Sequence, residues 1–180
     1  MKSLCVFCGS NPGSKPEYSD AAVALGFEVA KRDITLVYGG GRVGLMGTIA
    51  DAAIARGGRV IGVMPQHLVD REIAHRGLTN LHIVGSMHER KALMIELADA
   101  FALLPGGFGS WDEFCEAVTW RQLGIHSKSV GILNVLSYYE PLLALVRQSV
   151  TEGFVRTPLF EAMHVAENPP ALLDAMGFSR

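Results

Sequence analysis

Short apolar runs alternate with segments of helical periodicity along the whole chain. Seven of these runs are candidate strands, at residues 4–7, 34–38, 60–64, 81–84, 100–104, 130–133 and, with the weakest pattern, 164–166. Most of the runs are apolar at nearly every position, so both faces of each strand would be buried. This pattern is typical of parallel strands that helices cover on either side.

The segments between the runs carry apolar residues at helical spacing. Tyr18, Ala22, Leu25 and Val29 predict a helix over residues 17–32. The same pattern recurs at Trp111, Phe114, Cys115 and Val118. Further helices are predicted over 45–56, 87–98, 138–152 and 170–176. The alternation predicts an α/β fold, a doubly wound Rossmann-like parallel sheet of about six to seven strands with helices on both faces.

The length of the chain, 180 residues, fits one domain, and we predict a single nucleotide-binding domain over residues 1–180. No linker, repeat or low-complexity segment divides it. The least periodic stretch covers residues 66–80, which we predict to be a loop that faces the substrate.

Glycine-rich segments follow three of the predicted strands. They read CGSNPGS after the first strand, GGGRVGLMG after the second and PGGFGS after the fifth. Parallel strands end at one edge of a sheet, where glycine lets the backbone approach a ligand and helix N-termini attract anions. A tight strand-to-helix turn explains any one segment, but the three together favour a pocket for a nucleotide or sugar phosphate.

Sequence motifs narrow the classes of nucleotide that such a pocket would bind. Gly39, Gly41 and Gly44 match the dinucleotide fingerprint G-x-G-x-x-G. A dinucleotide site expects an acid at the end of the next strand, where this chain has Met64 and Pro65. The phosphate-binding pattern G-x-x-x-x-G-K-[ST] is absent from the chain. An NAD site is therefore disfavoured, and an ATP-hydrolysing P-loop is excluded.

Two acids follow the third glycine segment. Ser110 and Glu113 have the spacing of a capping box, S-x-x-E, which explains them by local structure alone. However, Glu113, Glu116 and Trp120 share one helical face, which starts beside the expected phosphate. We expect Glu113 to be ionised at neutral pH, because the helix N-terminus favours a negative charge. It would then stabilise a cation or activate water.

A second capping box, Ser86 with Glu89, precedes Arg90 and Lys91. Cations near a helix N-terminus are mildly disfavoured by the helix dipole. Solvated surface charge explains these two residues, and so does an anionic ligand at the same sheet edge. Arg90 keeps its protons, so it would clamp a phosphate or hydroxyl rather than act as a general acid.

Charge and composition exclude some classes of partner. The chain has 16 Lys and Arg against 18 Asp and Glu, so it lacks the basic field that nucleic acids or anionic membranes require. It has no run of about 18 apolar residues and no secretory signal pattern, so we expect a soluble, cytoplasmic protein. Apolar residues make up 49% of the chain, which favours a subunit interface.

The cysteines and histidines form no evident site. Cys5 and Cys8 lie three positions apart along a predicted strand, so they should point to opposite faces, and Cys115 is predicted to lie in the core. The six histidines show no metal-ligand spacing, so we predict no catalytic metal. His88 and His126 remain candidate proton donors.

Three segments, GGGRVGLMG, SMHERKA and LPGGFGSWDE, resemble the signature blocks of the Lonely Guy family, the cytokinin riboside 5′-monophosphate phosphoribohydrolases. The most specific element is PGGxGTxxE with an upstream RK pair, although Ser110 replaces the usual threonine. The resemblance implies that Arg90 and Glu113 are catalytic and that the protein is a homodimer. It also assigns a set of residues to the nucleotide: Gly40, Gly41, Glu72, Lys91, Gly106, Gly107, Phe108, Gly109 and Ser110.

The resemblance implies hydrolysis of the N-glycosidic bond of a purine nucleoside 5′-monophosphate, with no cofactor. The family was formerly often labelled as lysine decarboxylases, but such an enzyme would need a pyridoxal phosphate lysine, and neither Lys91 nor Lys128 has a suitable setting. The alternative is a non-catalytic nucleotide sensor or carrier of the same fold. Whether the base is adenine or an N6-modified adenine is left open by the sequence.

Overall fold

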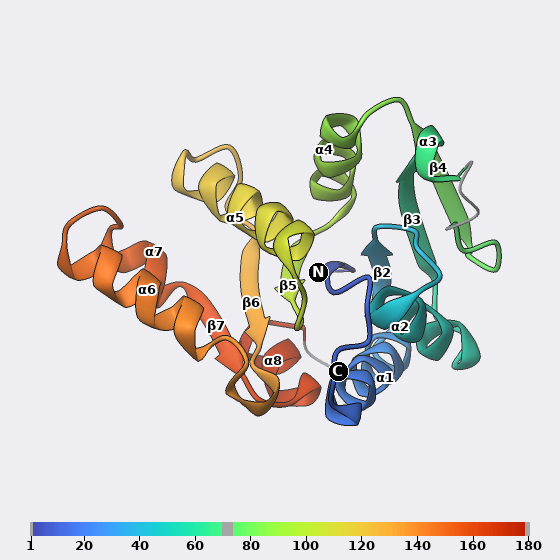
Figure 1. Cartoon of the computed structure of the whole chain (residues 1–180), viewed down its shortest axis with the longest axis horizontal. Coiled ribbons are helices and arrows are strands. Elements are labelled where there is room, and N and C mark those ends of the chain that lie inside the picture. Colours follow the sequence, from blue (N-terminus) through green and yellow to red (C-terminus); the bar gives the residue numbers. More distant parts are fainter. Residues whose placement is uncertain (1, 70–73, 179–180) are drawn as a thin grey trace.

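The computed structural model describes residues 2–69 and 74–178. In this part of the chain, seven parallel strands form one sheet in the order β4-β3-β2-β1-β5-β6-β7 (Figure 1). The strands are β1 Ser3–Phe7, β2 Thr35–Tyr38, β3 Val60–Pro65, β4 Asn80–Val84, β5 Ala100–Leu103, β6 Ser129–Leu133 and β7 Met163–Ala166. All seven predicted strands are confirmed, with ends that differ by at most a residue or so.

The helices connect the strands in the predicted alternation. They are α1 Pro16–Lys31, α2 Gly44–Ala55, α3 Gln66–Val69, α4 Met87–Leu97, α5 Phe108–Gln122, the 3-10 turn η1 Val135–Ser137, α6 Glu140–Thr151, α7 Thr157–Glu161 and α8 Pro169–Ala175. The helices α3 and α7 were not predicted, because they are too short to show a helical period. The stretch predicted as a loop thus begins with α3, and the helix predicted over 138–152 begins only at Glu140.

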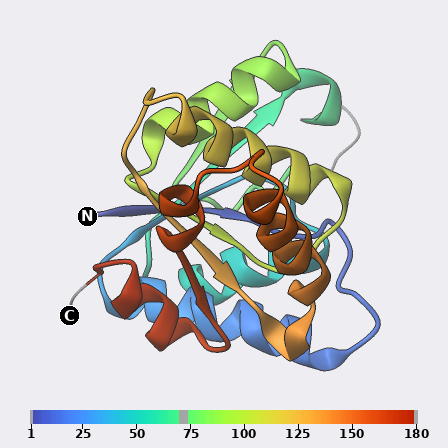
Figure 2. The same ribbon diagram turned by 90° about the vertical axis from the view of Figure 1, so that its left-hand side faces the viewer.

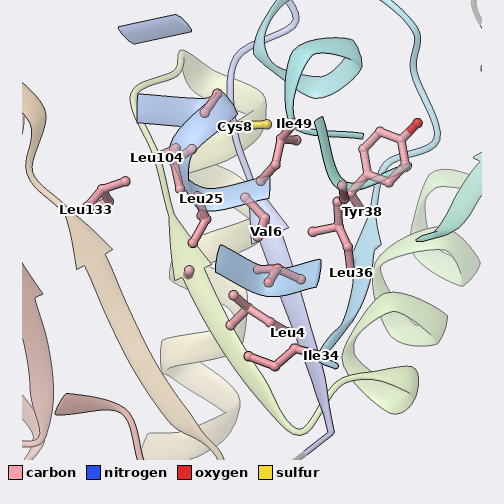
Figure 3. Close-up of a cluster of buried hydrophobic side chains, with 14 of the residues drawn as sticks. Leu4, Val6, Cys8, Leu25, Ile34, Leu36, Tyr38, Ile49, Leu104 and Leu133 are labelled. Carbon is pink, nitrogen blue, oxygen red and sulfur yellow. The ribbon is translucent and has the colours of Figure 1, made fainter. Parts of the chain in front are cut away.

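Helices cover both faces of the sheet, as predicted. Figure 2, which looks along the sheet from the β7 side, shows α4 and α5 on one face and α1 and α8 on the other. Successive residues of β1 enter opposite cores, with Leu4 on one side and Cys5 on the other. The core beneath α1 and α2 includes Leu25 and Ile49 (Figure 3). Burial of both strand faces explains why the strands read as continuous apolar runs.

The cysteine predictions have mixed outcomes. Cys5 and Cys8 belong to the cores on opposite faces of the sheet, which confirms their expected directions. Cys115 is exposed, so the prediction that it lies in the core is wrong. It adjoins the buried Phe114 on α5 and lines a groove between α5 and α6, together with Val118 and Leu142.

The sheet is wound in two directions from β1. Strands β2, β3 and β4 follow on one side of β1, and β5, β6 and β7 follow on the other. The order therefore reverses between β1 and β5, and open α/β sheets bind ligands beyond the strand ends at such a point. The first and third glycine segments follow these two strands. None of the described helices is long and apolar enough to cross a bilayer.

The two predicted capping boxes differ. Ser86 caps α4 as expected, because its Oγ accepts a hydrogen bond from Glu89 N at 3.1 Å, while Glu89 Oε2 accepts one from Gly85 N at 2.8 Å. The box predicted at Ser110 is wrong. Helix α5 begins at Phe108 with Gly107 as its N-cap, so Ser110 is already helical and its side chain is buried.

Candidate active site

A cavity of about 630 Å³ lies at the carboxyl ends of the strands. All three glycine segments line it, through residues 8–13, through Gly39, Leu45 and Met46, and through residues 105–110. The remaining lining residues are Tyr18, Met64, Leu68, Arg90, Glu113 and Tyr138. The predicted convergence of the three segments on one pocket is therefore confirmed.

The start of α5 is open to this cavity. A Cβ atom added at Gly107 or Gly109 would meet no atom within 4 Å, so the backbone there is uncovered. The first amides of a helix have no carbonyl one turn back to bond to, and they carry the positive end of the helix dipole. The five residues predicted to hold the nucleotide in this segment, Gly106 to Ser110, all line the cavity. The arrangement suits an anion such as a phosphate.

Arg90 projects from α4 into the inner wall of the cavity and is only 8% exposed. Its Nε donates to Val63 O at 3.0 Å, and its Nη2 donates to Gly39 O at 3.0 Å. A Cβ at Gly39 would overlap Nη2 of Arg90, so a larger residue there would displace the guanidinium from this position. Arg90 is therefore a fixed, buried cation, which overturns the alternative of a solvated surface charge.

Glu113 completes the inner wall from α5. Its Oε1 lies 3.3 Å from Nη1 of Arg90, and its side chain is only 11% exposed. Burial raises the pKa of Glu113 above its ordinary value, while the charge of Arg90 lowers it and that of Asp112 raises it. The net change, a raised pKa, is opposite to the lowered pKa that we expected from the helix dipole. Because α5 begins at Phe108, Glu113 lies beyond the first turn, where the dipole is weak and burial dominates.

Lys91 does not line the cavity, and its predicted contact with the nucleotide stays a prediction. Its Nζ lies 3.0 Å from Asp112 Oδ2 and 3.2 Å from Glu116 Oε2, so it joins α4 to α5. Burial lowers the pKa of Lys91, but the hydrogen bonds to Asp112 and Glu116 outweigh burial and leave the pKa raised. Lys128 donates to Ile95 O at 2.6 Å and does not line the cavity either.

The glycines of the second segment have two structural roles, one in the cavity wall and one in holding the chain that follows β3. Gly39 lines the cavity, whereas the carbonyl of Gly40 accepts a hydrogen bond from His75 N at 2.9 Å and Gly41 forms a bridge with Ala74. Gly40 takes a φ of +76°, which favours glycine. These two glycines thus hold the chain after β3. Their predicted contact with the nucleotide stays a prediction, and Glu72 lies outside the described residues.

Neither candidate proton donor lines the cavity. His88 is exposed on α4, and the ring of His126 packs against Phe101 with a centroid separation of 5.3 Å. Among the described residues, no group of three or more His, Cys, Asp or Glu side chains could bind a metal.

The sequence reasoning missed two aromatic residues of the site. Tyr138 and Tyr18 line the cavity and meet edge to face, with ring centroids 5.8 Å apart. Tyr138 follows β6, the neighbour of β5, so the rule that ligands bind beyond strand ends was a usable signal. Tyr138 was not predicted as a site residue because no glycine segment follows β6.

Solved structures share this fold at low sequence identity. The molybdenum cofactor binding protein of Rippkaea orientalis matches with a TM-score of 0.71 at 19% identity over 95% of this chain and 93% of that chain. The molybdenum cofactor carrier protein of Chlamydomonas reinhardtii matches with a TM-score of 0.71 at 20% identity over 95% and 92%. At this identity the likeness concerns the fold alone.

Sequence relatives are much more similar. A family model described as "Possible lysine decarboxylase" matches residues 46–176. The cytokinin riboside 5′-monophosphate phosphoribohydrolase LOG1 of Arabidopsis thaliana is 48% identical over 95% of this chain and 79% of its own length. The enzyme of that name from Rhodococcoides fascians is 50% identical over 86% of this chain and 78% of its own length. The chain therefore belongs to the Lonely Guy family of cytokinin riboside 5′-monophosphate phosphoribohydrolases.

Proposed function

We propose that this protein hydrolyses the N-glycosidic bond of a purine nucleoside 5′-monophosphate, with adenine or an N6-modified adenine as the base. The products are the free base and ribose 5-phosphate. One observation carries the proposal: the buried pair of Arg90 and Glu113 lies in the same cavity as the open N-terminus of α5. The relatives named phosphoribohydrolases support the same reaction.

The cavity offers a distinct surface to each part of such a substrate. The amides at the start of α5 would bind the 5′-phosphate, which brings the ribose beside Glu113, one helical turn further along. The apolar side chains of Leu45, Met46, Met64 and Leu68 form another part of the wall and would contact the base. Binding of the phosphate would thus orient C1′ at the carboxylate.

In the proposed reaction the C1′–N bond breaks, and its electron pair leaves with the base. The positive charge that develops on the ribose is stabilised by the ionised carboxylate of Glu113, as in glycosidases. Water adds its hydroxyl group to C1′ and gives its proton to Glu113, and the base takes up one proton from solvent. Glu113 then returns its proton to solvent, which restores the carboxylate. Arg90 keeps Glu113 in place and would donate hydrogen bonds to a ribose hydroxyl or the phosphate.

The direct test is chromatography of free bases after incubation with AMP and with N6-isopentenyl-AMP. The wild-type protein should release base, and the two rates would identify the preferred base. Glu113→Gln should reduce turnover by at least about a hundredfold while nucleotide binding is largely retained. Glu116→Gln is the matched control, because Glu116 lies on the same helix as Glu113 but pairs with Lys91 of α4 and does not line the cavity.

Two outcomes would overturn the proposal. Full activity in Glu113→Gln would remove Glu113 from the mechanism. Binding of both nucleotides by the wild-type protein with no release of base would instead favour a nucleotide sensor or carrier.

The proposal includes a homodimer in the cytoplasm, as expected from the sequence, with a small-molecule substrate and no nucleic acid partner. Phe108, beside the cavity, is 84% exposed, and Phe154 is 83% exposed. Large apolar side chains so open to solvent are typical of surfaces that a second subunit covers. Sedimentation equilibrium would measure the mass, and a monomer at micromolar concentration would contradict the dimer.

A further inference from the structure

Two consecutive tyrosines hold the loop that joins β5 to α5. The hydroxyl of Tyr139 donates to Leu104 O at 2.7 Å, and the hydroxyl of Tyr138 donates to Gly106 O at 2.7 Å. Both tyrosines come from the segment after β6, the next strand in the sheet. The loop that precedes the phosphate-binding amides is therefore fixed from outside by two hydroxyl groups.

The two bonds have different consequences for the backbone. A carbonyl and the following N–H lie in one peptide plane and point in opposite directions. Fixing the carbonyl of Gly106 therefore also fixes the N–H of Gly107. The carbonyl of Leu104 shares its plane with the nitrogen of Pro105, which has no hydrogen. Tyr139 also accepts a hydrogen bond from the N–H of Gly106. Of these two tyrosines, Tyr138 alone orients the N–H of Gly107.

The turn that presents the tyrosines is conformationally strained. Leu136 and Ser137 take positive φ angles of 50° and 58°, which residues other than glycine rarely adopt. The side chain of Asn134 holds the turn: its Oδ1 accepts a hydrogen bond from Tyr139 N at 2.8 Å, and its Nδ2 donates to Glu140 Oε1 at 2.9 Å. Such strain persists only where the surroundings enforce it, and it clusters at functional sites.

The positions of the two tyrosines separate their roles. Tyr139 is 2% exposed and lies in the core, whereas Tyr138 is 36% exposed and lines the cavity. The bond from Tyr138 to Gly106 thus lies at the wall of the site, beside the open start of α5. A hydrogen bond in that place contributes more to the shape of the site than to the core.

We propose that Tyr138 is a positioning residue whose hydroxyl sets the orientation of the Gly106–Gly107 peptide and so aligns the first amide that binds the substrate phosphate. The inference deepens the proposed function and rests on its assignment of the phosphate to α5. If the inference is correct, removal of the Tyr138 hydroxyl weakens the binding of ligands that carry the phosphate and leaves the binding of other ligands largely unchanged.

The test is a comparison of ligand affinities by calorimetry, in the Glu113→Gln background so that little substrate is consumed during the measurement. Tyr138→Phe keeps the ring and removes the hydroxyl. The dissociation constants of AMP and ribose 5-phosphate should rise about tenfold, the equivalent of one hydrogen bond. That of adenosine, which lacks the phosphate, should change by less than about twofold.

Tyr139→Phe is the matched control, because it removes hydroxyl bonds to Leu104 and Gly106 in the same loop without freeing the amide of Gly107. It should lower the melting temperature and leave the ratio of the AMP and adenosine affinities unchanged. An equal loss for AMP and adenosine in Tyr138→Phe, or no loss for AMP, would overturn the inference. Because the readout is binding, a failure of base release by the wild-type protein would contradict the proposed function and leave this test intact.

Discussion

Arg90 from α4 and Glu113 from α5 meet with Nη1 and Oε1 3.3 Å apart. The other polar nitrogens of Arg90 are held by main-chain carbonyls, Nε by Val63 O in β3 and Nη2 by Gly39 O just after β2. The sheet itself therefore sets the position of the guanidinium, and the guanidinium sets that of the carboxylate. This chain of contacts makes the Arg90–Glu113 pair rigid without a ligand.

The first prediction concerns Arg90→Lys. A lysine keeps the positive charge but has one nitrogen, so it cannot reach the two carbonyls and Glu113 together. We expect kcat/KM to fall by roughly a hundredfold. Arg147→Lys is the control, because Arg147 makes an exposed ion pair with Glu140, and it should stay within about twofold of wild type. Comparable activity in both variants would show that the geometry of Arg90 is unimportant.

The second prediction concerns pH. The proposed mechanism needs ionised Glu113, whose pKa is raised by burial, so protonation should abolish activity at a higher pH than for an ordinary glutamate. The acid limb of kcat/KM should therefore lie above about pH 4.3. Asp112→Asn removes a charge that raises this pKa, so the limb should move to lower pH. The profiles of both proteins are measured between about pH 4 and pH 8. If the acid limb does not move in Asp112→Asn, a group other than Glu113 controls it.

The third prediction concerns Gly109→Ala. Gly109 lies in the first turn of α5, where alanine is the better helix former by about 1 kcal/mol, and the added Cβ would meet no atom within 4 Å. The melting temperature should rise by about 2–4 °C. The KM for the nucleotide should also rise, because the methyl group would border the phosphate. A more stable variant with an unchanged KM would place the phosphate elsewhere.

Local pattern was a reliable guide to some parts of the site and a poor one to others. Ser86 caps α4 as predicted, because α4 begins at Met87, directly after Ser86. Ser110 has the same S-x-x-E spacing, yet α5 begins earlier, at Phe108, and Ser110 is buried. The two segments look alike in sequence, and only packing against the rest of the molecule distinguishes them.

By itself, the sequence determined the seven parallel strands, the two-faced burial of the sheet and the three glycine segments at one edge. These features depend on periodicity and on backbone freedom, which are local properties of the chain. Tertiary structure alone decided that Arg90 is buried on the carbonyls of Val63 and Gly39, that burial raises the pKa of Glu113, and that Tyr138 reaches Gly106. Each of these depends on residues far apart in the sequence that meet only when the sheet is assembled.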